Sequence, residues 1–192
     1  PRLRKWAERF VGDYHSPKYS PWSVCLTSGS TDGINKCLLL LTEAGDTVLA
    51  ARWCYPGILS GSKPQGRKVE AIDMDADGIR PDSLRKTCAR LKARGKIFRV
   101  LYIVPVGQNP TGCTMPLERK QALYAVAQEF DLIVLEDDPY YFLQLPPYER
   151  SSSVGSGEGN EPCPALQELV PGVEKTKLIP SFFSLDAAAR AQ

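Results

Sequence analysis

Short apolar runs alternate with longer amphipathic segments through most of this sequence. The apolar runs are rich in Val, Ile, Leu and Ala, which is typical of strands buried inside a sheet. They lie at residues 23–30, 46–51, 68–75, 98–106 and 132–138. We predict a strand for each of them, the first running into a turn.

The segments between these runs have the length and the end residues of helices. Helices are predicted at residues 2–11, 31–45, 81–95 and 116–130, with a shorter helical turn at 55–63. Pro81 begins one of these segments and Gly95 ends it, which is the usual placement of these residue types at helix ends. Gly45 similarly marks the predicted end of the helix at 31–45.

Strands separated by helices of roughly 10 to 15 residues are typical of βαβ units. We therefore predict an α/β fold with three αβα layers, in which a mostly parallel sheet lies between two layers of helices. Ligands bind such sheets at the carboxyl ends of the strands. Three predicted strand ends carry polar residues that could serve this purpose: TSGSTDG at 27–33, VGQNPTG at 106–112 and LEDDPYY at 135–141.

The composition changes along the chain and divides it into four regions. Residues 1–22 are predicted to form an N-terminal helix and loop, and residues 23–145 form the α/β region. Residues 146–180 are rich in Ser, Gly and Pro and are predicted to be a surface insertion. Residues 181–192 return to a pattern that continues the α/β region.

The bulk composition excludes several classes of protein. With 192 residues, 43% of them hydrophobic, and a net charge of +2, the chain is predicted to be globular and has no electrostatic signature of nucleic-acid or membrane binding. The one basic run, at 85–96, is interpreted as the solvated face of a helix. No apolar run reaches the roughly 20 residues that a membrane span requires.

The six cysteines are scattered singly, and His15 is the only histidine, so no metal site or disulfide framework is expected. Reduced thiols are typical of the cytoplasm, which is the predicted location. The chain shows no signal peptide. Because it begins with Pro rather than Met, the question of an upstream targeting segment stays open.

Two of the polar strand ends are suited to an anion and to a partly charged oxygen. Ser30 and Thr31 follow a glycine at the predicted start of a helix, where free backbone N–H groups and hydroxyls can bind a phosphate. Alternatively, one of them simply caps the helix. Asn109 stands before Pro110, which holds the preceding residue in an extended conformation from which its amide can donate a hydrogen bond. Taken alone, this segment is also an ordinary turn.

The third strand end brings carboxylates to the edge of a buried strand. Asp137 or Asp138 requires a cationic or hydrogen-bonding partner there, unless the turn is solvated. A phosphate site, a neutral amide donor and a carboxylate near Tyr140 together match the phosphate, the O3′ oxygen and the ring nitrogen N1 of pyridoxal 5′-phosphate. The protonated N1 of this cofactor makes its ring an electron sink.

At these residues the sequence resembles the class I/II aminotransferases of the type I pyridoxal-phosphate fold, in the branch of aromatic, 2-aminoadipate and kynurenine aminotransferases. The segments that carry the resemblance, in order, are TSGSTDG, AGDTVL, YPG, GIRPDSL, GQNPTG, LIVLEDDPYYFL and PSFFSLD. The resemblance implies that the α/β region is the large cofactor-binding domain, in incomplete form.

The resemblance also implies roles for individual residues. Ser30 and Thr31 would bind the cofactor phosphate, and Tyr55 would stack on the ring. Asn109 and Tyr140 would hydrogen-bond O3′, and Asp137 would pair with N1. Asp137 stands three residues before Tyr140, as in the family, but Asp138 has the same spacing to Tyr141, so this register stays open. The catalytic residues expected within the chain are therefore Asp137 and Tyr140.

Two features depart from the family pattern. The family's Schiff-base lysine lies in an S-x-S-K segment beyond the position that corresponds to Gln192, so the chain is expected to be a truncated piece that is inactive alone. Arg52, Trp53 and Cys54 stand where the family often has an acidic residue and a proline.

For the full-length protein the resemblance implies amino transfer from an aromatic or 2-aminoadipate-like amino acid to a 2-oxo acid such as 2-oxoglutarate, in a homodimer. Two alternatives stay open. The chain could be a non-catalytic binding module that keeps the fold without the lysine, or the fold could support a lyase or decarboxylase.

Overall fold

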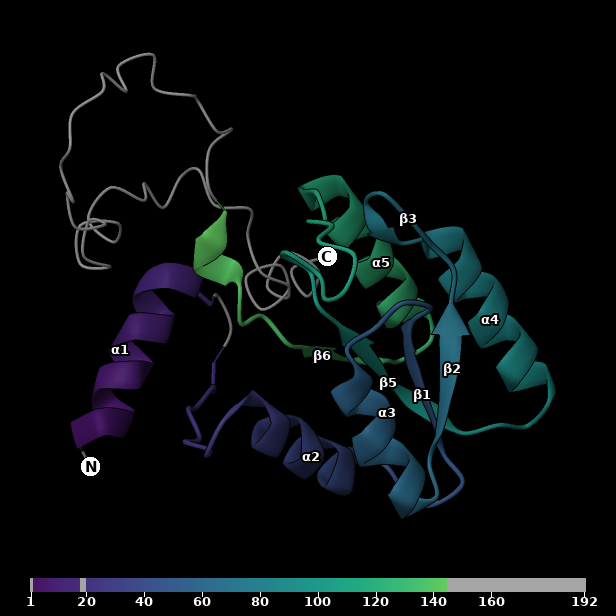
Figure 1. Ribbon diagram of the computed structural model, residues 1–192, viewed down its shortest axis with the longest axis horizontal. Coiled ribbons are helices and arrows are strands. Elements are labelled where there is room, and N and C mark those ends of the chain that lie inside the picture. The colour runs from purple at the N-terminus through teal and green to yellow at the C-terminus, as the bar shows by residue number, and fades with distance from the viewer. Residues whose placement is uncertain (1, 18–19, 145–192) are drawn as a thin grey trace, which may run out of the picture.

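A four-stranded sheet with helices on both sides forms the body of the molecule (Figure 1). The computed structural model describes residues 2–17 and 20–144. The predicted insertion at 146–180 and the segment 181–192 lie outside the described residues, so the proposed division into regions stays a prediction.

The helices and strands alternate through the chain as the apolar pattern predicts. The helices are α1 (Arg2–His15), α2 (Ser30–Leu41), α3 (Pro56–Ser62), α4 (Pro81–Ala93) and α5 (Leu117–Glu129), with short 3-10 turns η1 (Lys63–Gln65) and η2 (Tyr141–Leu143). The strands are β1 (Thr47–Ala51), β2 (Lys68–Ile72), β3 (Met74–Asp75), β4 (Gly78–Ile79), β5 (Phe98–Ile103) and β6 (Ile133–Glu136).

The main sheet has the order β2-β1-β5-β6, and every neighbouring pair in it is parallel. Strands β3 and β4 form a separate antiparallel hairpin. The predicted α/β fold with a mostly parallel sheet between helical layers is therefore confirmed.

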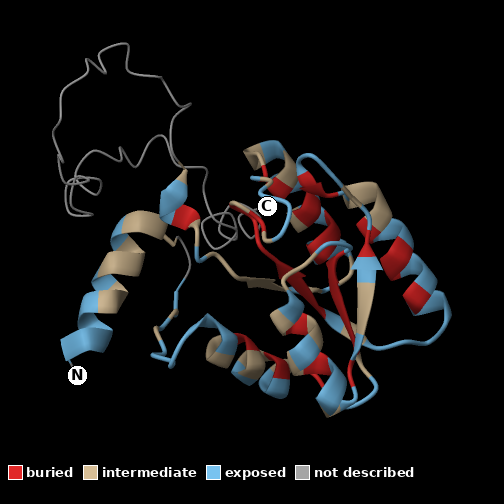
Figure 2. Cartoon of the chain, in the orientation of Figure 1, coloured by how far each residue is buried: buried red, intermediate tan, exposed pale blue. Residues whose placement is uncertain are grey.

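Side chains alternate across the sheet and build one apolar layer on each side. On one side Val48, Val100 and Tyr102 pack with residues of α2 and α3. On the other side Leu49 and Leu101 pack with residues of α4 and α5. Figure 2 shows the buried residues concentrated on the central strands and on the helix faces that cover them.

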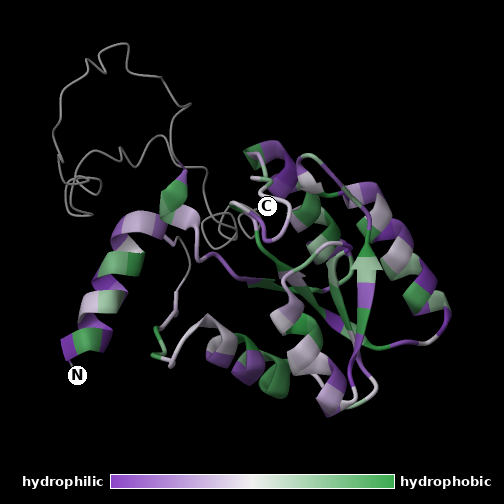
Figure 3. Ribbon diagram, in the orientation of Figure 1, coloured by the Kyte–Doolittle hydropathy of each residue, from purple (hydrophilic) through white to green (hydrophobic). Residues whose placement is uncertain are grey.

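Helix α1 lies at one end of the molecule and packs against η2 rather than against the sheet (Figure 1). Its Phe10 and Tyr14 rings lie 5.5 and 5.0 Å from the ring of Phe142, measured between centroids. Hydrophobic and hydrophilic residues alternate in bands along this helix (Figure 3), and it is four residues longer than the predicted helix at 2–11.

Three local predictions differ from the structure. Residues 23–29 form no strand, and most of their side chains, including Leu26, are exposed, so they lack both a ladder partner and a core to pack on. The predicted strand at 68–75 is interrupted after Ile72 and continues in the hairpin. Helix α2 ends at Leu41 with Thr42 as its C-cap, while Gly45 takes a positive φ of 95° in the following turn.

Candidate active site

Residues Tyr102 and Asp137 face the same side of the sheet. Tyr102 is paired with Leu135 across the parallel β5 and β6 strands, and Asp137 follows Leu135 by two positions. Because side chains alternate along a strand, Leu135 and Asp137 point to the face of Tyr102, which is the face covered by α2 and α3.

A hydrogen bond joins these two residues. The Tyr102 hydroxyl donates to Asp137 Oδ2 over 2.7 Å, and the backbone N–H of Asp137 donates to the carbonyl of Ile103 over 2.9 Å. Tyr102 is only 1% exposed. Burial first, and then the neighbouring Asp137 carboxylate, raises the pKa of Tyr102, so its hydroxyl keeps its proton and acts as a donor.

Asp138 has a different environment from Asp137. Both of its carboxyl oxygens are buried without a hydrogen-bond partner among the described residues. Burial, followed by the negative charge of Glu136, raises the pKa of Asp138 to about 7. Lys120 of α5 lies near enough to oppose this rise, and Lys120 is itself fully buried. Asp138 therefore faces the α5 side of the sheet, away from Tyr102.

Ser30 and Thr31 lie at the N-terminus of α2, as predicted. Gly29 precedes the helix, no side chain caps it, and both hydroxyl residues are exposed. Asp32 instead accepts a hydrogen bond from the backbone N–H of Ser28 over 3.0 Å. The capping role considered for Ser30 or Thr31 is therefore not what the structure shows, and the first N–H groups of α2 point out of the helix end.

Tyr55 directly precedes α3, and the helix leaves room for its ring. A Cβ added at Gly57 would overlap the Tyr55 ring carbon Cε1. Cys54 and Tyr55 lie close enough to Tyr102 to contribute to the raised pKa of Tyr102. The structure thus brings the predicted stacking residue next to the Tyr102–Asp137 pair.

Gln108 connects the loop before Tyr55 with the turn that contains Asn109. Its side chain is 4% exposed; Nε2 donates to the carbonyl of Trp53, and Oε1 accepts from the backbone N–H of Thr111 over 3.1 Å. Asn109 is half-buried beside this bridge.

The Asn109 turn also lies against Tyr140. Gly107 has a positive φ of 55°, and a Cβ placed on it would lie 3.5 Å from the Cβ of Tyr140. The structure therefore brings together the turn of Asn109 and Tyr140, the two residues predicted to share one oxygen of the cofactor.

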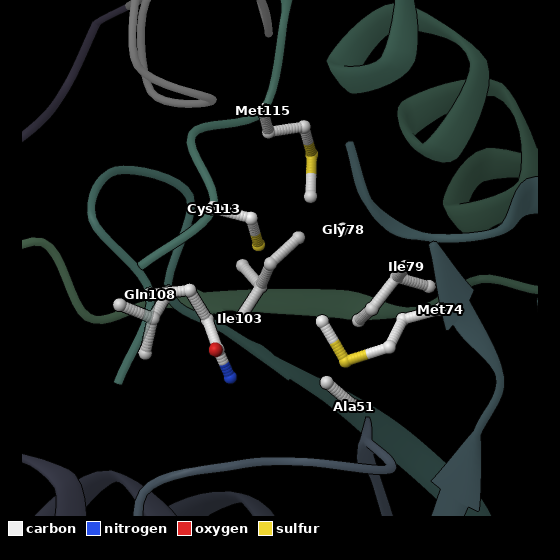
Figure 4. Close-up of a pocket in the computed structure, with 9 residues that line it drawn as sticks. Ala51, Met74, Gly78, Ile79, Ile103, Gln108, Cys113 and Met115 are labelled. Carbon is white, nitrogen blue, oxygen red and sulfur yellow. The ribbon is translucent and has the colours of Figure 1, made fainter. Parts of the chain in front are cut away.

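A small apolar cavity lies beside the bridge made by Gln108 (Figure 4). Its lining includes three sulfur-bearing side chains, Met74, Cys113 and Met115, but no charged one. It opens between the β3–β4 hairpin and the loop before α5. With no charged side chain in its lining, it is not the candidate site for a phosphate or a carboxylate.

The sequence model of the aminotransferase class I and II family matches residues 1–145 of the chain. The chain belongs to the class I and II aminotransferases.

Known aminotransferases are similar to this chain over most of its length. An aromatic amino acid aminotransferase of Schizosaccharomyces pombe is 37% identical over 191 residues, which are 99% of this chain and 38% of that protein. The mitochondrial kynurenine/alpha-aminoadipate aminotransferase of Mus musculus is 36% identical over 76% of this chain and 37% of its own length. The chain thus spans less than two fifths of these relatives.

Solved aminotransferase structures share the fold. The structure of aminotransferase Aro8 from Candida albicans matches this chain with a TM-score of 0.81 and 28% identity. The match covers 99% of this chain and 38% of the Aro8 chain. A kynurenine aminotransferase of Pyrococcus horikoshii, solved in complex with PMP, matches with a TM-score of 0.67 and 30% identity. The match covers 71% of this chain and 34% of the Pyrococcus chain.

Sequence reasoning missed Tyr102 and Gln108 at the candidate site, and Lys120 beside Asp138 on the other face of the sheet. Tyr102 lies within the apolar run at 98–106 and Gln108 within the turn GQNPTG, while Lys120 lies in the predicted helix at 116–130. The alternation along residues 98–106 and 132–138 was the available signal for Tyr102, because it places Tyr102 and Asp137 on one face once the strands are paired.

Within the described residues of the aminotransferase chain, no helix is long and apolar enough to cross a membrane, and no group of three His, Cys, Asp or Glu side chains could hold a metal ion. The described cysteines are free thiols.

Proposed function

We propose that this chain is the cofactor-binding part of a pyridoxal 5′-phosphate-dependent aminotransferase. The proposed reaction moves an amino group from an aromatic or 2-aminoadipate-like amino acid to a 2-oxo acid such as 2-oxoglutarate. Family membership supports the reaction class, and the aromatic and kynurenine/alpha-aminoadipate aminotransferases among the relatives support the substrate class.

The side chains at the candidate site fit this cofactor. Among the described residues, no hydrogen-bond partner is found for the side chains of five predicted ligands: Ser30, Thr31, Tyr55, Asn109 and Tyr140. Hydroxyls at an uncapped helix start suit a phosphate, an amide and a phenol suit a ring oxygen, and a carboxylate suits a protonated ring nitrogen.

The observation that carries the proposal is the shared sheet face. Asp137 points to the side of the sheet covered by α2, which begins with Ser30 and Thr31, and by α3, which Tyr55 precedes, whereas Asp138 points to the α5 side. This arrangement favours Asp137 over Asp138 as the partner of N1, which is the assignment that the spacing to Tyr140 suggested.

Each side chain has a defined task in this proposal. Ser30 and Thr31 bind the phosphate, and Tyr55 supplies a flat aromatic face for the ring. Asn109 and Tyr140 donate hydrogen bonds to O3′, and the Asp137 carboxylate holds a proton at N1. When bound, the cofactor supplies an electron sink for the electron pair left at the substrate Cα.

The proposal extends to the protein at its natural length. We propose a homodimer, as in the family, that acts on small amino acid and 2-oxo acid substrates in the cytoplasm, without binding nucleic acid or membrane.

The test is amino transfer by the protein at its natural length. With pyridoxal 5′-phosphate, an aromatic amino acid and 2-oxoglutarate, we expect glutamate and the corresponding 2-oxo acid in equal amounts. Release of ammonia or carbon dioxide instead would indicate a lyase or a decarboxylase. Failure to bind the cofactor at all would contradict the proposal.

A further inference from the structure

The sheet contains a buried phenol, that of Tyr102, which is not among the proposed cofactor ligands. Tyr102 is among the largest fully buried side chains of the molecule, and its ring packs with residues of β1, α2 and α3. A buried hydroxyl requires a hydrogen-bond partner, and among the described residues Asp137 is the one that this hydroxyl reaches.

The contacts of Asp137 leave one oxygen available. Its backbone N–H is bound to the Ile103 carbonyl, and its Oδ2 accepts from Tyr102. The other carboxylate oxygen, Oδ1, has no hydrogen-bond partner among the described residues. Two attachments to β5 therefore hold the backbone and one oxygen of Asp137, while Oδ1 can meet a ligand.

We propose that Tyr102 is a positioning residue that holds the Asp137 carboxylate with Oδ1 directed to the ring nitrogen N1 and keeps the shared proton on that nitrogen. This inference rests on the proposed function, because it concerns the residue that pairs with N1.

The physical reason lies in the basicity of the carboxylate. A hydrogen bond donated to a carboxylate stabilises its charged form and makes it a weaker base. Asp137 therefore stays ionised, and the bond to Oδ2 keeps Oδ1 turned to N1, so a fixed negative charge there raises the pKa of the protonated nitrogen. Without the hydroxyl the carboxylate can rotate away from N1, and the pKa of the nitrogen falls. Because Tyr102 itself is buried beside a carboxylate, its hydroxyl remains protonated and keeps donating across the physiological pH range.

A purely structural role for Tyr102 makes a different prediction. Its ring fills space between Val100, Val104 and the helices, and a phenylalanine ring would fill the same space. The substitution Tyr102→Phe therefore removes the hydroxyl and leaves the packing. If Tyr102 served packing alone, the protonation of N1 would not respond to this substitution.

The experiment measures the ring nitrogen directly. Pyridoxamine 5′-phosphate labelled with ¹⁵N in the ring is bound to the protein at its natural length, and the ¹⁵N chemical shift is followed over a pH series. This probe needs no covalent bond to the protein and no turnover. We expect the pH midpoint of N1 protonation to fall by about one unit in Tyr102→Phe, which is about tenfold in the protonation constant.

Two variants serve as references. Asp137→Asn removes the carboxylate and is expected to lower the midpoint further than Tyr102→Phe. Tyr124→Phe removes a phenol hydroxyl from α5, on the opposite side of the sheet, and is expected to leave the midpoint unchanged. Circular dichroism confirms that each variant is folded before the probe is added.

A second measurement tests the hydrogen bond without any cofactor. A hydroxyl proton that is buried and bonded to a carboxylate exchanges slowly, so we expect a downfield ¹H resonance that disappears in both Tyr102→Phe and Asp137→Asn. Its absence from the wild type would overturn the positioning role.

The outcomes separate this inference from the proposed function. If wild-type protein binds the probe and Tyr102→Phe keeps the wild-type midpoint, the positioning role of Tyr102 is wrong and the proposed function stands. If wild-type protein does not bind the probe, the proposed function is wrong, and the role of Tyr102 in it falls as well.

Discussion

The adjacent carboxyl groups of Asp137 and Asp138 have different environments. Asp137 accepts a hydrogen bond from Tyr102, while the buried oxygens of Asp138 have no such partner among the described residues. The strand alternation alone produces this difference, because it directs successive side chains to opposite faces of the sheet. One carboxylate is thereby placed for a ligand and the other for the protein interior.

Replacing Asp137 by Ala is expected to lower kcat of the natural-length protein by at least about 100-fold, since it removes one preorganised charged group from the site. The fold should persist, because Asp137 lies at the end of its strand. Steady-state kinetics with an aromatic amino acid and 2-oxoglutarate provide the measurement. The exposed Asp131→Asn is the matched control and should keep wild-type activity. Activity of Asp137→Ala within a few-fold of wild type would exclude the assigned role.

Asp138 is expected to make stability fall as pH rises. Its pKa is raised from 3.8 to about 7, so between these pH values the folded state holds a proton that the unfolded chain has released. Stability is therefore lost as pH rises from about 4 to about 7. Asp138→Asn removes this penalty but also takes away the carboxylate that faces Lys120, so the net gain in stability at pH 8 should be about 1 kcal/mol, or roughly 2 to 4 °C in Tm.

Thermal unfolding of wild type and variant at pH 5 and pH 8 measures this effect. The difference between the two proteins should be large at pH 8 and small at pH 5. An equal shift of Tm at both values would show that Asp138 does not titrate in this range.

At the scale of loops and strands, Gln108 joins two segments that are distant in sequence. Gln108→Leu keeps the volume but leaves the Trp53 carbonyl and the Thr111 N–H without their side-chain partner. An unpaired buried polar group costs about 1 to 3 kcal/mol, so Tm should fall by roughly 2 to 12 °C. The affinity for pyridoxamine 5′-phosphate should also fall, by up to about tenfold, since the loops of Tyr55 and Asn109 are no longer connected.

The same substitution on an exposed helix surface provides the control. Gln128 lies exposed on α5, and Gln128→Leu should change neither Tm nor affinity appreciably. If Gln108→Leu behaved like Gln128→Leu in both measurements, the bridge would have no energetic role.

The order of elements was predictable from the sequence because long periodic segments bury a face. Strand β5 and helix α4 follow the expected bounds closely, with Pro81 and Gly95 at the predicted ends of the helix. The predicted strand at 23–30 was wrong because an apolar run becomes a strand only where it finds a ladder partner, and Leu26 is 50% exposed here. The two-residue strands β3 and β4 are too short for any periodicity to reveal.

The candidate site was predictable only as far as single residues at strand ends. Asn109 and Asp137 were proposed because polar groups follow apolar strands at those positions. Tyr102 and Lys120 could not be found in this way, since their importance depends on pairing between strands and on the packing of α5, which no local pattern specifies.

At the scale of the whole molecule, we predict that the protein at its natural length is a homodimer. Class I and II aminotransferases are expected to complete their sites across a two-fold interface. The chain also exposes Leu39, Leu40 and Trp53 to a large extent, and large exposed apolar side chains are typical of surfaces that contact other protein. Light scattering coupled to size-exclusion chromatography gives the mass, and a stable monomer at high concentration would contradict the prediction.

The contact between α1 and η2 has a consequence for synthesis on the ribosome. Phe10 and Tyr14 leave the ribosome more than a hundred residues before Phe142, the ring against which they pack. At about 5 to 20 residues per second, the first helix waits on the order of 10 seconds for its partner. During that interval its aromatic face is exposed to chaperones and to other nascent chains, so α1 is the last part of the described fold to become packed.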